Sequence, residues 1–210
     1  MKLKVPFARN LNKWKGSGWC GPLALASILR YYGYQDKIEE IVKKAGYLKG
    51  KGTTPQGLIN YCLNKGMQVD YFSLKEIQTH ENKQFSEKLQ QFYKRVNSEK
   101  RDKIFLKKNK KFKGYNYIEK NSSVKDIEAI LNKQRPILIL HNLVEVYNKA
   151  ELWMHYVAIV GFDKNNFYVH NVFPKNRRFE KVKKSLLMKS LSSNGLSKSL
   201  IVPYKKCASQ

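Results

Sequence analysis

One helix with a cysteine at its start is indicated by Cys20-Gly-Pro-Leu-Ala-Leu-Ala-Ser-Ile-Leu-Arg-Tyr-Tyr-Gly33. Pro22 suits a first helical turn, where its missing N–H is not needed, and Gly33 is a typical stop. At a helix start, unpaired N–H groups and the helix dipole favour a thiolate. Cys20 is therefore a candidate nucleophile, although taken alone it is also explained as a small buried hydrophobic residue.

A candidate base, His155, opens an apolar strand that runs to Gly161. A turn at residues 163–166 and a second strand ending at Asn171 complete a hairpin, so the His155 and Asn171 side chains are expected to meet. An amide oxygen that accepts from the imidazole would fix the ring and its tautomer. We expect the ring at a sheet edge near the surface. Strand parity places His170 on the face opposite Asn171, and His155 taken alone also fits a structural histidine.

Further elements follow from hydrophobic periodicity and from turn residues. Helices are predicted at residues 37–45, 56–65, 81–96 and 124–131. Strands are predicted at residues 67–73, 136–140 and 200–204. Helices come first and sheet afterwards, which predicts an α+β chain. With no internal repeat and no convincing linker, residues 1–210 are expected to form a single domain.

The charge is extreme, with 41 Lys+Arg against 16 Asp+Glu and a formal net charge of +25. The most basic segment lies in an expected insertion around residues 76–120. It carries Lys100, Arg101, Lys103, Lys107, Lys108, Lys110 and Lys111. Such a cluster can bind a polyanion, either nucleic acid or an anionic membrane. A solvated insertion, and a Lys-rich composition that reflects mutational bias, explain the same residues.

The three cysteines, Cys20, Cys62 and Cys207, fit neither a disulfide framework nor a zinc site, so we expect no metal or other cofactor. No stretch approaches the roughly 18 apolar residues of a membrane span, and residues 1–14 lack the apolar core of a secretion signal. The sequence therefore predicts a cytoplasmic protein without a transmembrane segment. A leader removed before this numbering begins would leave the same sequence.

Several blocks carry a resemblance to a known family: Cys20 to Gly33, Thr54 to Leu58, Gln134 to Ile139, His155 to Asp163, and Phe167 to Asn171. They resemble family 39 of the cysteine peptidases, papain-like enzymes that trim double-glycine leaders from bacteriocins, together with stand-alone relatives. The resemblance implies a papain-like fold, with N-terminal helices packed on a C-terminal antiparallel sheet. It also implies a peptide or protein substrate, with Cys20 as nucleophile, His155 as base and Asn171 as orienter. Leader peptidases more often have Asp at this last position.

One position departs from the family pattern. The family usually places a Gln six residues before the cysteine, where its amide helps to form the oxyanion hole, and here that residue is Trp14. The remaining oxyanion-hole candidates are the Cys20 backbone N–H, Asn12 and the Trp14 indole, with Asn10 as a further amide. Loss of one such donor typically costs about 10²- to 10³-fold in rate. A weak or inactive peptidase-fold module that binds a peptide or protein partner is therefore the alternative to an active peptidase.

Overall fold

The structure is a computed structural model that describes residues 1–9, 18–48, 52–73, 113–142, 145–146, 154–173, 176–192 and 198–206. The helices are α1 (Cys20–Tyr31), α2 (Ile38–Lys44), α3 (Pro55–Asn64), α6 (Val124–Asn132) and α8 (Lys184–Ser192). The strands are β1 (Gln68–Ser73), β2 (Tyr115–Glu119), β3 (Ile137–Asn142), β4 (Met154–Phe162), β5 (Asn166–Asn171), β6 (Arg177–Lys183) and β7 (Leu200–Tyr204). The predicted helix at 81–96 and most of the expected basic insertion lie outside these residues.

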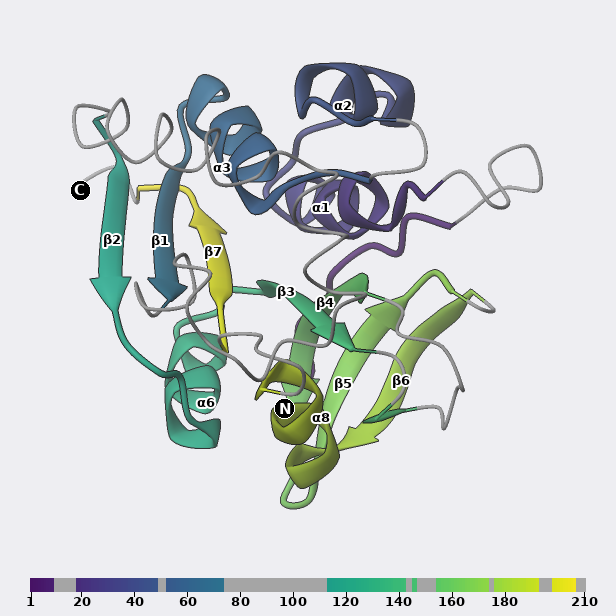
Figure 1. Ribbon diagram of the computed structural model, residues 1–210, viewed down its shortest axis with the longest axis vertical. Helices are drawn as coiled ribbons and strands as arrows, with labels where there is room; N and C mark the ends of the chain where they lie inside the picture. Colours follow the sequence, from purple (N-terminus) through teal and green to yellow (C-terminus); the bar gives the residue numbers. More distant parts are fainter. Residues whose placement is uncertain are drawn as a thin grey trace, which may run out of the picture.

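The seven strands form one sheet in the order β2-β1-β7-β3-β4-β5-β6, which Figure 1 shows from left to right. Strands β1 and β2 pair in parallel, and every other neighbouring pair is antiparallel. The α+β prediction is confirmed. The sheet also takes in a strand from the N-terminal half of the chain, because β1 pairs with the last strand, β7.

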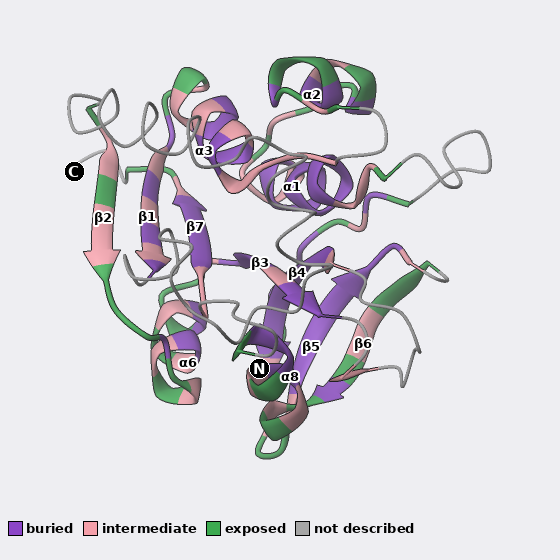
Figure 2. Cartoon of the chain, viewed as in Figure 1, coloured by how far each residue is buried: buried purple, intermediate pink, exposed green. Residues whose placement is uncertain are grey.

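Helix α1 forms the centre of the core. Its residues 21–29 are all buried, and the helix packs mainly against β4 (Figure 2). Gly21 makes this approach close, since a Cβ there would lie 3.1 Å from the ring of Tyr156. The small residue therefore brings the first turn of α1 against β4, one position along the strand from His155.

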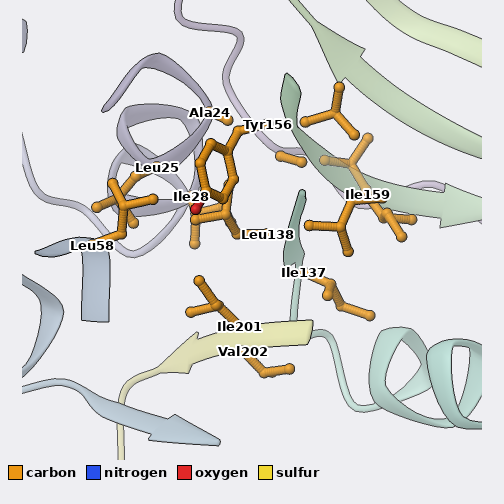
Figure 3. Packing of buried hydrophobic residues seen from close by; sticks show 14 of the residues in the cluster. Ala24, Leu25, Ile28, Leu58, Ile137, Leu138, Tyr156, Ile159, Ile201 and Val202 are labelled. Carbon is orange, nitrogen blue, oxygen red and sulfur yellow. The ribbon is translucent and has the colours of Figure 1, made fainter. Parts of the chain in front are cut away.

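The central strands are covered on both faces. Figure 3 shows Leu138 and Tyr156 beside α1, whereas Ile137 lies on the side of α6. Neighbouring residues of a strand point to opposite faces, so α1 and α6 pack against opposite sides of the sheet. Ile137, Leu138 and Ile139 are completely buried, as expected of a strand covered on both sides.

Two helix starts follow local sequence signals. The Thr54 hydroxyl accepts a hydrogen bond from the N–H of Gly57 at 3.2 Å, and Pro55 occupies the first helical position of α3. Ser123 and Asp126 form a reciprocal capping box at the start of α6. Both helices begin where the sequence predicts a cap.

Gly57 allows a second close approach, because an added Cβ would lie 1.9 Å from the carbonyl oxygen of Ala45. Gly57→Ala must push the end of α2 away from α3, and overpacking of this kind costs about 1–3 kcal/mol or more. We expect a fall in Tm of about 2–4 °C for each kcal/mol, measured by circular dichroism. Asn64→Ala, at an exposed position of the same helix, is the matched control. Equal Tm values for the two variants would contradict the steric argument.

Candidate active site

Cys20 is the first residue of α1 and is partly exposed. The main-chain N–H groups of Tyr156, Gly21 and Cys20 itself interact with the thiol and favour the thiolate, in the direction that the sequence predicts. Burial acts in the opposite direction and is the larger effect, so the pKa of the Cys20 thiol is raised. The N–H groups at the start of α1 thus act in the predicted direction, and burial outweighs them.

The Cys20 thiol thus contacts the main chain of Tyr156, which follows His155 in β4. His155 lies in β4, between β3 and β5, and only 3% of its surface is exposed. The expected position near the surface is wrong because β4 is an internal strand and the rings of His141 and Phe173 lie beside the imidazole, with centroids at 5.9 and 5.8 Å. Burial lowers the pKa of His155 to about 4, and the Asn171 hydrogen bond and the Glu180 charge only partly oppose this.

The hairpin of β4 and β5 brings His155 and Asn171 together. His155 Nε2 and Asn171 Oδ1 are 2.8 Å apart, and the same oxygen accepts the N–H of Phe173 at 3.0 Å. An amide oxygen only accepts, so Nε2 of His155 carries the hydrogen and donates it. In the neutral ring, Nδ1 is then the nitrogen that can accept a proton.

Two residues of β6 extend this chain of hydrogen bonds, and the sequence reasoning missed both. Asn171 Nδ2 donates to Glu180 Oε2 at 2.9 Å, and the other oxygen of Glu180 pairs with Arg177. A usable signal was present, because Glu180 is the one acidic residue in Arg177-Arg-Phe-Glu-Lys-Val-Lys183. An isolated acid in a basic strand often has a specific partner, but the sequence does not identify it.

The two neighbouring histidines are also buried. His141 lies directly opposite His155 in the register of β3 and β4. Its pKa is lowered to about 3, mainly by burial, and within the described part of the chain neither ring nitrogen has a hydrogen-bond partner. His170 packs between the rings of Phe7 and Phe179, with centroids at 5.2 and 4.8 Å. Neither ring shares the hydrogen bond that joins His155 to Asn171.

Other predicted site residues are not placed. Asn10, Asn12 and Trp14 lie outside the described residues, so the side-chain candidates for the oxyanion hole stay predictions. The same holds for the basic cluster from Lys100 to Lys111 as a polyanion site.

Cys62 lies in α3 and is completely buried, which raises the pKa of its thiol strongly. Among the described helices, none is long and apolar enough to span a membrane.

Comparison with known proteins gives a family and a fold. A model of the Peptidase_C39 like family matches residues 2–191. A C39-like peptidase from Bacillus anthracis superposes with a TM-score of 0.57 at 12% identity, with 98% of each chain covered. The peptidase domain of Streptococcus ComA, a bifunctional ABC transporter in a quorum-sensing pathway, gives 0.52 at 14% identity and the same coverage of both chains.

A third solved structure is a double-glycine motif protease from an AMS/PCAT transporter in complex with its leader peptide. It gives a TM-score of 0.53 at 14% identity and covers 98% of this chain and 94% of that one. No curated protein matches the chain. At these identities the solved structures establish the fold, which is that of C39-like, papain-like peptidases.

Proposed function

The chain belongs to the Peptidase_C39 like family, and we propose that it is a cysteine peptidase that cleaves a peptide bond through an acyl-enzyme on Cys20. The observation that carries this proposal is the hydrogen bond of 2.8 Å between His155 and Asn171. It leaves Nδ1 of the imidazole as the proton acceptor, and the Cys20 thiol contacts the next residue of the same strand. Nucleophile, base and orienter thus come from three elements, α1, β4 and β5.

The proposed reaction begins when His155 takes the proton from the Cys20 thiol and the sulfur attacks the scissile carbonyl. The N–H groups at the start of α1 stabilise the oxyanion that forms. The imidazolium then donates its proton to the leaving amine, the C–N bond breaks, and an acyl-thioester remains on Cys20. Water attacks this thioester, His155 accepts the proton of the water, and the sulfur leaves with the proton restored.

Burial favours both a neutral thiol and a neutral imidazole in the free protein. The substrate class we propose is a peptide or a peptide segment of a protein. The solved double-glycine protease that binds a leader peptide supports this choice, since it has the same fold.

Selective alkylation of Cys20 tests the site without knowledge of the substrate. We expect iodoacetamide to modify Cys20 of the folded protein at pH 7.5 and to spare Cys62, because Cys20 is partly exposed and has a base nearby while Cys62 is completely buried. Mass spectrometry of the digested protein measures both sites. If His155 accepts the proton, the rate reaches a plateau below pH 9, whereas a thiol that titrates alone reacts faster up to and above pH 9. Labelling of Cys20 only after denaturation would contradict the proposal.

A peptide-binding module without turnover is the second candidate. The raised pKa of Cys20 and the lowered pKa of His155 favour it, because together they oppose formation of a thiolate–imidazolium pair. Peptide binding that is unchanged in Cys20→Ala, with no cleavage by the wild type, would support this candidate over the peptidase.

A further inference from the structure

Glu180 lies in β6, where its side chain contacts Asn171 of the proposed site. Its side chain is 9% exposed, one carboxylate oxygen accepts from Asn171 Nδ2 at 2.9 Å, and the other pairs with Arg177. The Arg177 side chain is 46% exposed, so the ion pair faces solvent on one side and Asn171 on the other. A partly buried carboxylate is therefore held against the amide that contacts His155.

A β-bulge creates this arrangement. Val169 pairs with Glu180 and Asn171 pairs with Arg177, so His170 alone on β5 lies opposite two residues of β6, Arg178 and Phe179. In a regular strand, residues three apart point to opposite faces, but the extra residue turns Arg177 and Glu180 to the face of Asn171. Phe179 adopts φ +54° in the bulge, a left-handed backbone that a bulky residue rarely accepts. Strained backbone of this kind persists where the surroundings fix it and is concentrated at functional sites.

The neighbours of Asn171 determine which way its amide faces. The Phe173 N–H can only donate, and it lies 3.0 Å from Oδ1. The Glu180 carboxylate only accepts, so the Asn171 atom facing it must be the NH₂ group. These two contacts agree, and together they direct the amide oxygen to His155 Nε2. The tautomer of His155 is thus fixed from outside the ring.

We propose that Glu180, held by Arg177, is a positioning residue that fixes the Asn171 amide and makes position 171 selective for an amide over a carboxylate. The importance of this role for catalysis rests on the proposed function of His155 as the base. An Asp at position 171 would place a carboxylate oxygen where Nδ2 now lies, 2.9 Å from Glu180. Two like charges at this distance repel in a partly buried site.

A double-mutant cycle tests this selectivity. Asn171→Asp is expected to lower Tm by about 5 °C at pH 7.5, and Asn171→Asp with Glu180→Gln is expected to recover most of that loss, because the Gln amide can donate to the new carboxylate. Glu180→Gln alone has the smaller effect. Glu128→Gln, which removes another partly buried carboxylate paired with a lysine, is the control and leaves position 171 untouched. Additive Tm changes in the cycle would overturn the proposal.

The pH midpoint at which His155 titrates distinguishes a positioning role of Glu180 from a purely structural one. In the double variant a carboxylate without a repelling neighbour accepts from Nε2, so the midpoint of His155 in ring-nitrogen NMR should rise by about 1 unit or more over wild type. Glu180→Gln alone should lower it, and Glu128→Gln should leave it unchanged. A His155→Gln sample assigns the signal. Midpoints that are equal in all variants would overturn the positioning role.

These measurements require no turnover, so the two proposals can fail separately. If the cycle and the midpoints behave as expected while wild-type Cys20 is unreactive, the peptidase proposal fails and the Glu180 network stands. If Cys20 is reactive while the cycle is additive, the peptidase proposal stands and the role of Glu180 is wrong.

Discussion

Cys20→Ala is expected to lower kcat/KM for peptide cleavage by about 10⁴-fold or more, because Cys20 supplies the atom that bonds to the substrate. Ala is well suited to a helix, and the Cys20 side chain is partly exposed, so the fold should be retained. A mixture of tryptic peptides from casein serves as the substrate, with cleavage followed by mass spectrometry. Rates are then compared on the peptide that the wild type cleaves fastest.

Cys62→Ala is the matched control for this variant. It removes a buried thiol from α3 and is expected to lower Tm through lost packing while leaving cleavage at the wild-type rate. The opposite pattern, with cleavage lost in Cys62→Ala and retained in Cys20→Ala, would show that another thiol carries the reaction. Circular dichroism of both variants separates a loss of chemistry from a loss of folding.

His155→Gln is expected to lower kcat/KM by about 10²- to 10⁴-fold, the usual contribution of a general base. Gln can still hydrogen-bond to Asn171, but its amide does not accept and return a proton near neutral pH. The rate of Cys20 alkylation at pH 7.5 should fall with it, since the thiol then has a raised pKa and no base beside it. Alkylation at the wild-type rate in His155→Gln would exclude His155 as the base.

The pH dependence of cleavage follows from the pKa of His155. A base is inactive when protonated, and burial lowers the pKa of His155 from 6.5 to about 4, so activity should persist well below pH 6.5 and fall as the pH approaches 4.

The stability of the fold should depend on pH for the same reason. A group whose pKa is depressed by folding contributes to the free energy of unfolding above its unfolded pKa and loses that contribution as the pH falls. Wild-type Tm should therefore fall more steeply than that of His155→Gln between pH 6.5 and 4. Parallel curves would contradict a buried neutral His155.

The parts of the site that sequence could predict depend on local signals. Asp163 marks the hairpin turn, where its carboxylate accepts the N–H groups of Asn165 and Asn166 at 2.9 and 2.7 Å. The turn starts the hairpin, and a β-bulge between Ile159 and Gly161 then shifts the register by one residue, which places Asn171 on the face of His155. In the same way Pro22 and Ser123 mark helix starts through their own backbone geometry.

The parts that could not be predicted depend on partners distant in sequence. The burial of His155 follows from β3 and Phe173, which no local pattern identifies as its neighbours. Strand β6 was missed because its sequence, Arg177 to Lys183, is mostly charged and lacks clean alternation, and the bulge at Phe179 changes its parity. The sequence pattern places β2 within the basic insertion, because the pairing with β1 that stabilises this strand is not visible in its own residues.

The strand order also has a consequence for the synthesis of the protein. Strand β7 is the last of the seven strands to leave the ribosome, yet in the sheet it lies between β1 and β3. Until it is made, the pair β2-β1 and the group β3-β4-β5-β6 have no strand to join them, and both halves expose an unpaired edge. Long-range pairing of this kind is slow to form and open to wrong partners. Closure of the sheet between β1 and β3 therefore depends on residues 200–204, the last strand of the seven along the chain.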